Sequence, residues 1–155
     1  ENNLFTKIHT LNEARIPRLL AQYGERIGGF AGKTVALLGL SFKPHTDDMR
    51  EAPSVRVVPQ LLEQNAVLRC FDPEAIPTAA YFLPQDKHLS YYSHLPECVK
   101  GADVIMALIE WPEITGFDYA AVRDPSKTQY FIDARNQLDP QKITAAGFVY
   151  LGIGR

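Results

Sequence analysis

Short apolar segments alternate with segments of helical spacing along this chain. The apolar segments have the length of strands and lie at residues 35–38, 67–71, 88–92, 103–109, 130–134 and 148–153. The helical patterns lie at residues 12–28, 54–64, 95–101, 119–123 and 140–146, and a loop with a short helix is expected at 74–87. Because strands that alternate with helices pair in parallel, the pattern predicts an α/β fold. Right-handed crossovers then favour a Rossmann-like, doubly wound, mainly parallel sheet with helices on both faces, preceded by an N-terminal helix.

Prolines, glycines and one asparagine indicate where the helices begin and end. The pair Gly28–Gly29 is expected to end the first helix, and Pro17 to kink it or to mark where its regular part begins. Pro53 suits the first turn of the second helix, whereas Pro59 predicts a bend in it or a late helix start. Asn65 follows that helix, and we expect it to adopt the left-handed conformation of a C-cap.

The composition is that of a globular protein and excludes several classes of partner. With 155 residues the chain is long enough for one domain with a sizeable core, and its formal net charge of −2 gives no reason to expect a nucleic-acid partner. No run of about 18 apolar residues predicts a membrane span, and the first residues lack the pattern of a secretion signal. They are typical of a chain entered in mid-sequence, and we expect a cytoplasmic protein.

The loop at residues 39–50 is the candidate binding site. It follows the first predicted strand, and ligands of parallel sheets bind outside the carboxyl ends of the strands. The loop contains Gly39 but not the G-x-G-x-x-G pattern, so it is not a standard dinucleotide site. Lys43 and Arg50 nevertheless offer cationic donors for phosphate, Phe42 offers an aromatic face, and the following helix presents a positive N-terminus.

The same loop has a second interpretation, in which it binds nothing. Its two cations are then solvated or pair with neighbouring carboxylates, which are Asp47, Asp48 and Glu51. Asp47 and Asp48 also suggest a metal, but they are more typical of helix caps and no matching group of ligands follows. We therefore expect no metal site.

Cysteine, histidine and tryptophan residues lack the spacing of a catalytic or metal site. Cys70 and Cys98 are too few for a disulfide framework or a zinc site and predict buried thiols in a reducing compartment. Trp111 is expected to serve in packing rather than in stacking on a ligand. The histidines are expected at the surface or at helix ends, and one of them also lies inside the candidate loop; they are His9, His45, His88 and His94.

Five segments of the chain resemble one family, in the same order. They are GKTVALLGLSFKPHTDDMREAPS at residues 32–54, CFDPEA at 70–75, GADVIMALIEWPEI at 101–114, FIDARNQLDP at 131–140 and GFVYLGIGR at 147–155. They resemble the C-terminal domain of the UDP-glucose and GDP-mannose dehydrogenases. By this resemblance residues 32–155 form a domain that binds a nucleotide sugar through its UDP part. Residues 1–31, with Asn12 in a matching Asn-Glu segment, are similar to the tail of the central helix that links the family's domains and forms its dimer.

The resemblance implies an NAD-dependent oxidoreductase. The family oxidises the C6 hydroxyl of a nucleotide sugar to a carboxylate in two hydride transfers to NAD. Its N-terminal Rossmann domain binds NAD and carries the catalytic Cys. Carried across to this sequence, Phe42 and Lys43 contact the nucleotide sugar, and Arg50 reaches the NAD bound by the other domain. Arg135 contributes to the sugar-nucleotide pocket across the subunit interface of a homodimer.

The catalytic segment of that family has no counterpart in this chain. Neither Cys70 nor Cys98 lies in the family's nucleophile motif, and the NAD fingerprint is missing too. We expect no catalytic residue here and no turnover by the chain alone.

The substrate and the class of protein are left with alternatives. The segment DDMREAP at residues 47–53 resembles bacterial UDP-glucose 6-dehydrogenases, which convert UDP-glucose to UDP-glucuronate; GDP-mannose and UDP-N-acetylhexosamine 6-dehydrogenases are the alternatives. A stand-alone nucleotide-binding or regulatory module also fits the missing segments. A receiver-like domain with Asp47, Asp48 or Asp72 as phosphate acceptor fits less well, because no Lys follows the later strands.

Overall fold

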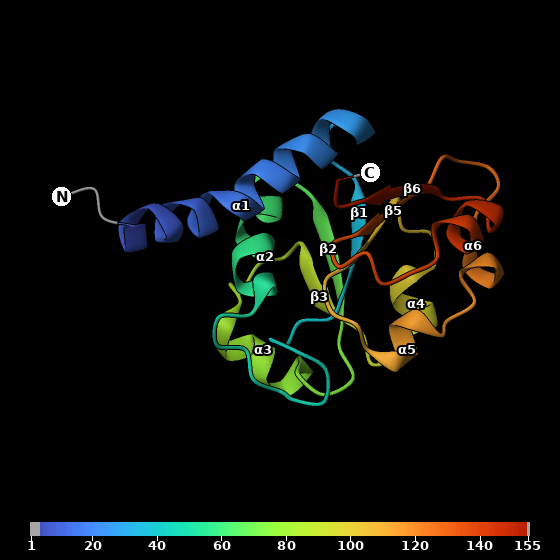
Figure 1. Ribbon diagram of the computed structural model, residues 1–155. Helices are drawn as coiled ribbons and strands as arrows, with labels where there is room; N and C mark the ends of the chain where they lie inside the picture. Colours follow the sequence, from blue (N-terminus) through green and yellow to red (C-terminus); the bar gives the residue numbers. More distant parts are fainter. Residues whose placement is uncertain (1–3, 155) are drawn as a thin grey trace.

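The computed structural model describes residues 4–154 and, for residues 4–13, the helical backbone without the side chains. Within this part of the chain, six parallel strands form one sheet in the order β3-β2-β1-β4-β5-β6 (Figure 1). The strands are β1 (Thr34–Leu38), β2 (Val67–Phe71), β3 (Leu89–Tyr91), β4 (Val104–Ala107), β5 (Tyr130–Asp133) and β6 (Val149–Gly152). The strand order reverses between β1 and β4, which is the arrangement of a doubly wound Rossmann-like sheet. The predicted fold class is confirmed, and the order 2-1-3-4-5 of receiver-like domains is not the one found.

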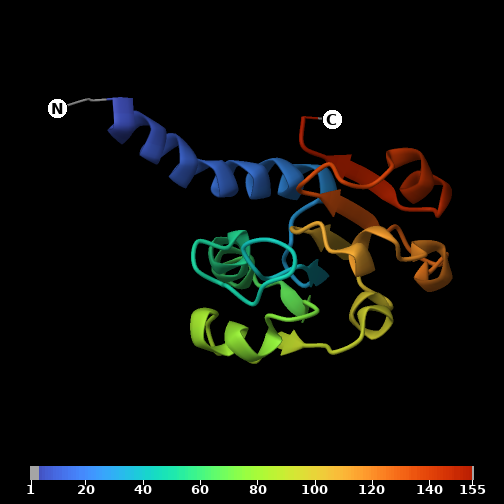
Figure 2. The same cartoon turned by 60° about the horizontal axis from the view of Figure 1, so that its bottom comes forward.

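Helices lie on both faces of the sheet, as predicted. They are α1 (Leu4–Ile27), α2 (Pro53–Glu63), α3 (Ile76–Phe82), α4 (Leu95–Val99), α5 (Pro112–Thr115) and α6 (Pro140–Ala145), together with the 3-10 helix η1 (Tyr119–Val122). Figure 2 shows α2 and α3 on one face and α4, α5 and α6 on the other. The second half of α1 packs beside α2, so α1 adds to the same layer as α2.

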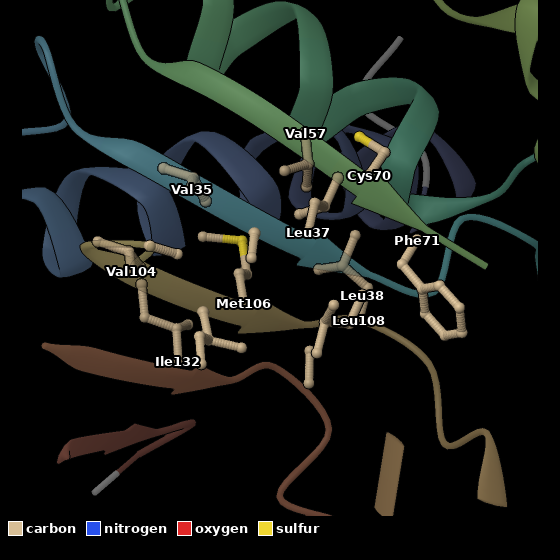
Figure 3. Close-up of a cluster of buried hydrophobic side chains, with 14 of the residues drawn as sticks. Val35, Leu37, Leu38, Val57, Cys70, Phe71, Val104, Met106, Leu108 and Ile132 are labelled. Carbon is tan, nitrogen blue, oxygen red and sulfur yellow. The ribbon is translucent and has the colours of Figure 1, made fainter. Parts of the chain in front are cut away.

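The core lies around the central strands β1 and β4. All of β4 and the last four residues of β1 are buried, and Figure 3 shows their side chains packed against those of β2 and β5. Leu37 pairs in register with Met106, and Met106 with Ile132, so three neighbouring strands share one apolar layer. Burial of each such side chain stabilises the fold by about 1.5–3 kcal/mol. The core thereby holds the carboxyl ends of β1, β4 and β5 together at one edge of the sheet.

The first helix is longer than its sequence pattern predicts. α1 begins at Leu4 rather than near residue 12, and it continues through Pro17. The prediction that Pro17 marks the start is therefore wrong. Figure 2 shows the axis of α1 changing direction in its middle, which agrees with a kink at a residue that has no N–H to donate. The pair Gly28–Gly29 ends the helix, with φ of 75° and 86°.

The ends of the other helices agree with the predictions only in part. α2 begins at Pro53, so the late start suggested by Pro59 is wrong, and Pro59 lies inside the helix. Asn65 has φ of 60°, which confirms the left-handed cap. The segment expected as a helix at 119–123 is a 3-10 helix, and α5 before it is too short, at 4 residues, to show a helical period in the sequence.

Candidate functional site

A pocket of about 440 Å³ opens where the carboxyl ends of β1, β4 and β5 approach α1. Its wall is built from α1, the loop after β1, the start of α2 and the residues that end or follow β4 and β5. The pocket thus lies at the point where the strand order reverses, and ligands of doubly wound sheets bind at this point. Its volume is in the range of small-molecule sites.

The pocket combines cationic and apolar walls. Arg15 comes from α1, Arg56 from α2 and Arg135 from the loop after β5, and Glu51 is the carboxylate that shares the wall with them. The Nη2 atom of Arg56 lies 3.4 Å from the Oε2 atom of Glu51. The apolar wall is formed by Ile16, Leu19, Leu20, Val57, Met106 and Leu108. Such a combination suits a ligand that joins a flat or apolar group to negative charges.

Two of the predicted substrate-binding residues meet in this pocket. Phe42 and Arg135, which are distant in the sequence, both line it, and the Phe42 side chain is 51% exposed. The guanidinium of Arg135 donates two hydrogen bonds of 3.0 Å to Glu110, and these bonds hold the pKa of Glu110 below its ordinary value. Because the pair is half-exposed, it contributes only about 0–1 kcal/mol and opposes an incoming phosphate weakly.

Arg50 and Lys43 lie elsewhere. Arg50 donates to both carboxylate oxygens of Asp48, at 3.0 and 2.8 Å, and this contact lowers the pKa of Asp48 to about 2. The pairing of Arg50 with a neighbouring carboxylate is therefore the interpretation that the structure supports. Arg50 borders a shallow depression with Thr78 and Phe82, and neither it nor Lys43 lines the 440 Å³ pocket. Lys43 is exposed on the loop after β1.

The prediction that Asp47 and Asp48 cap a helix is wrong. The N-cap of α2 is Ala52, which makes no side-chain cap hydrogen bond. Asp48 instead binds Arg50, and Asp47 accepts a 3.2 Å hydrogen bond from the hydroxyl of Thr78. Among the described residues there is no group of three or more His, Cys, Asp or Glu side chains able to hold a metal ion.

The loop after β1 leaves the sheet through Gly39. This residue has φ of 87°, and a Cβ placed on it would lie 2.6 Å from the Cβ of Ile109. The loop then closes on itself, since the Phe42 N–H donates to the Asp48 carbonyl at 2.8 Å. His45 has a left-handed backbone with φ of 60°. These contacts restrict the backbone of the loop to one conformation, in which Phe42 lines the pocket.

This loop is held by a buried carboxylate that the sequence analysis considered only as a phosphate acceptor of the receiver-like alternative. Asp72 follows β2, is 2% exposed, and accepts hydrogen bonds from the N–H groups of Leu40 and Ser41 at 2.7 and 3.1 Å. The indole N–H of Trp111 donates to the same oxygen at 3.2 Å. The Asp-Pro step at the end of a strand was the available signal, but it does not reveal which groups the carboxylate contacts.

Asp133 plays the matching part for the loop that carries Arg135. It ends β5, is fully buried, and accepts from the N–H groups of Arg135 and Leu138 at 3.1 and 2.8 Å. The Tyr150 hydroxyl donates to it at 3.0 Å. Tyr23, from α1, lines the pocket, and its hydroxyl is buried and without a hydrogen-bond partner in the described part of the chain. Burial raises the pKa of Tyr23, and the charge of Asp133 adds to that effect.

The remaining predicted features behave as structural residues. Cys70 and Cys98 are buried thiols, and burial raises the pKa of both, that of Cys98 to about 12. Trp111 is 2% exposed, which confirms its packing role, and the His45 ring lies edge-on against it at 5.3 Å. The histidines with described side chains are exposed, as predicted; they are His45, His88 and His94.

Three predicted features lie outside the described residues or side chains. They are the side chains of His9, Asn12 and Arg155. The described helices include none that is long and apolar enough to cross a membrane.

Comparison with known proteins gives one consistent result. Residues 36–140 match the model of the UDP-glucose/GDP-mannose dehydrogenase family, UDP binding domain. The chain is 40% identical over 152 residues to a UDP-glucose 6-dehydrogenase of Bacillus subtilis, an alignment that covers 98% of this chain and 34% of the relative. The chain thus spans about a third of the length of that relative.

Solved structures give the same fold. A UDP-glucose dehydrogenase from Pyrobaculum islandicum superimposes with a TM-score of 0.71 and 29% identity, over 90% of this chain and 30% of that one. An NDP-N-acetyl-D-galactosaminuronic acid dehydrogenase from Methanosarcina mazei superimposes with a TM-score of 0.73 and 27% identity, over 96% of this chain and 30% of that one.

Proposed function

This chain belongs to the UDP-glucose/GDP-mannose dehydrogenase family, and we propose that it is the nucleotide-sugar-binding part of an NAD-dependent UDP-glucose 6-dehydrogenase. One observation carries the proposal: a single pocket at the strand-order reversal is lined by both Phe42 and Arg135, which are distant in the sequence. In the complete enzyme, UDP-glucose is oxidised to UDP-glucuronate in two hydride transfers to NAD.

The walls of the pocket suit the two halves of a nucleotide. Phe42 and the apolar wall from α1 and α2 offer a surface to a base or sugar ring, while Arg15, Arg56 and Arg135 lie around it as donors to a diphosphate. The ion pair between Arg135 and Glu110 breaks at a small cost in free energy because both side chains are half-exposed, so Arg135 is able to bind phosphate oxygens instead. Lys43 follows Phe42 in the chain and is exposed, and we expect it to add a cation to the diphosphate although it does not line the pocket itself.

Arg50 has a different task in this proposal. It lies outside the pocket, 80% exposed, and its guanidinium is held by Asp48 on the surface. An exposed, oriented arginine at this edge of the domain suits contact with NAD bound by another domain. We propose that domain to be the N-terminal Rossmann domain, which supplies the NAD fingerprint and the catalytic Cys, so that the chain alone does not turn over substrate.

The domain boundary and the oligomer remain predictions. Residues 1–31 are proposed as the tail of the linking and dimerisation helix, and residues 32–155 as the UDP-binding domain of a homodimer. The resemblance implies that Arg135 acts across the subunit interface. Within this chain it lines the same pocket as Phe42, which supports a contribution to its own subunit's site as well.

Calorimetric titration of the chain with UDP-glucose, UDP, GDP-mannose and NAD tests the proposal. Binding of the UDP ligands is expected, with an affinity loss of about tenfold or more in Arg135→Ala, because a charge-assisted hydrogen bond contributes about 1.5–3 kcal/mol. A smaller loss is expected in Lys43→Ala. Lys142→Ala, an exposed cation on α6, is the control and leaves the affinity unchanged. Equal losses in Arg135→Ala and Lys142→Ala would contradict the pocket assignment.

The substrate alternative has its own support. One similar structure is that of an NDP-N-acetyl-D-galactosaminuronic acid dehydrogenase, so an N-acetylhexosamine in place of glucose is the second candidate. Competition between UDP-glucose and UDP-N-acetylhexosamines for the pocket separates the two. Tighter binding of GDP-mannose than of any UDP-sugar would contradict both.

A further inference from the structure

We propose that Asp72 is a positioning residue for the nucleotide-sugar site, which sets the conformation of the loop that carries Phe42 and Lys43. The ligand is taken from the proposed function, whereas the role of Asp72 rests on contacts within the chain. Asp72 does not line the pocket, so it acts on a ligand only through the loop.

One carboxylate oxygen collects donors from two separate segments. Oδ2 of Asp72 accepts from the N–H groups of Leu40 and Ser41 and from the Trp111 indole N–H. The Ser41 hydroxyl lies 3.2 Å from the same oxygen and 3.0 Å from the Lys43 carbonyl, and its one proton serves these two acceptors. Leu40 and Ser41 immediately precede Phe42, and Trp111 follows β4. The two residues before Phe42 are therefore tied by their backbone to the end of β2.

The hydrogen bonds to the second oxygen, Oδ1, fix the orientation of the Asp72 carboxylate. Oδ1 accepts from the N–H groups of Glu74 and Ala75 at 2.9 and 2.8 Å, in the turn that leads to α3. A buried charge is tolerated only when its lone pairs are satisfied, and here N–H and O–H dipoles satisfy both oxygens. Rotating the group to serve another ligand would leave five N–H groups without acceptors.

Asp72 stands at the position in the sheet where dinucleotide-binding domains carry an acid that contacts the ligand. In dinucleotide-binding Rossmann domains the acid after the second strand accepts hydrogen bonds from the ribose of the ligand. Here the acid after β2 is turned inward and is consumed by the loop after β1. Asp72 therefore has no free acceptor for a ribose, and contact with a ligand is left to the side chains on the loop that it holds.

The hydrogen bond between Trp111 and Asp72 provides an intrinsic fluorescence probe of this loop. Trp111 is the only tryptophan of the chain, its N–H binds Asp72, and the His45 ring of the loop lies edge-on against it at 5.3 Å and 68°. A change in the carboxylate or in the loop therefore alters the environment of the single indole. The fluorescence emission of Trp111 therefore reports a change in the conformation of the loop, and no added label is needed.

Asp72→Asn is the decisive variant. The amide of Asn has the shape of the carboxylate but only one acceptor oxygen, since an NH₂ group replaces the other. Either the Leu40–Ser41 segment or the turn at residues 74–75 then loses its acceptor. We expect UDP-glucose to bind about tenfold more weakly, the Trp111 emission to shift, and the amides of Leu40 and Ser41 to exchange with solvent about tenfold faster. Far-UV circular dichroism is expected to stay that of the wild type.

Asp103→Asn is the matched control. Asp103 also accepts a backbone N–H, that of Thr34, but it lies at the amino end of the strands, away from the pocket. It is expected to lower stability while it leaves UDP-glucose affinity and Trp111 emission unchanged. If Asp72→Asn behaves in the same way, its role is structural only and the proposal is overturned.

Two further results are interpretable. If the wild-type chain does not bind UDP-glucose, the proposed function fails, but the emission and amide exchange of Asp72→Asn still decide whether Asp72 positions the loop. If Asp72→Asn does not fold, Ser41→Ala, which removes the hydroxyl shared between Asp72 and the Lys43 carbonyl of the same loop, is expected to weaken UDP-glucose binding about threefold. Wild-type affinity and amide exchange in Ser41→Ala would overturn the proposal.

Discussion

At the scale of single residues, buried carboxylates hold the loops around the pocket, and the arginines of these loops pair with surface carboxylates. Asp72 and Asp133 each follow or end a strand and accept N–H groups from a loop that carries a predicted binding residue. Arg50 and Arg135 are held by surface carboxylates instead. Exposed pairs break at little cost, whereas a buried carboxylate that loses its partners is strongly destabilising. The loops are therefore held more firmly than the arginine side chains that they carry.

Gly39 is the residue whose replacement is expected to damage the site most directly. Gly39→Ala combines a left-handed backbone with a Cβ 2.6 Å from Ile109, and we expect it to lower the free energy of unfolding by about 3 kcal/mol. Gly32→Ala is the control, because its φ is 72° but nothing lies within 4 Å of an added Cβ. It is expected to cost about 1 kcal/mol. Urea unfolding measures both, and equal losses would show that Ile109 yields to the added methyl group.

At the scale of elements, contacts at both ends of the strands hold the sheet in register. At the amino end, Asp103, just before β4, accepts the N–H of Thr34 on β1 at 2.8 Å and pairs with Lys127 at 2.7 Å. At the carboxyl end, Asp72 and Asp133 tie the loops that leave the strands. Parallel strands depend on such contacts because their connections are long and do not set the register locally.

The Asp103 contact predicts a dependence of stability on pH. Partial burial opposes ionisation of Asp103, but hydrogen bonds from Lys127 and Thr34 outweigh it and place its pKa below the ordinary value. A lowered folded-state pKa contributes stability that is present above the unfolded pKa, about 4, and is lost as the pH falls through the folded value. Asp103→Asn is therefore expected to be less stable than the wild type at neutral pH, and the difference to shrink as the pH falls through the folded-state pKa of Asp103. Urea unfolding at several pH values checks this, and a difference that is constant with pH would contradict it.

At the scale of the whole molecule, the strand order places the pocket and the core makes it rigid. The reversal places β4 beside β1, with β5 next to β4, and the loops after β1 and β5 contribute Phe42 and Arg135 to the same pocket although they are distant in sequence. α1 then closes one side through Arg15 and its apolar face. The pocket is a product of the complete fold rather than of any one segment.

The two thiols report whether that fold is intact. Cys70 on β2 and Cys98 in α4 are both fully buried, and burial raises the pKa of each thiol. We expect neither to react with a thiol reagent at about pH 8 in the native chain, and both to react in urea. Gly39→Ala is expected to speed labelling because it populates the unfolded state more. Rapid labelling of one thiol in the native chain would reveal local opening around that residue.

Much of the architecture is already determined by the sequence. Apolar runs identify the six strands, Pro53 and Asn65 identify the two ends of α2, and the motifs around residues 32–54 identify the family. These features are local, because periodicity, a missing N–H and a left-handed backbone each act within a few residues. The errors at Pro17 and Pro59 have a related cause: tertiary packing of α1 and α2 keeps helices intact where a proline would end them in isolation.

The tertiary structure alone decides which side chains share a site. Asp48 pairs with Arg50 rather than capping α2, and Asp72 supports the loop after β1 rather than a ligand. Arg15 and Arg56 join the pocket although neither lies in a motif. A carboxylate or a guanidinium takes the partners that the fold brings within hydrogen-bond distance. The sequence therefore determines the elements and the family, and only their packing determines the site.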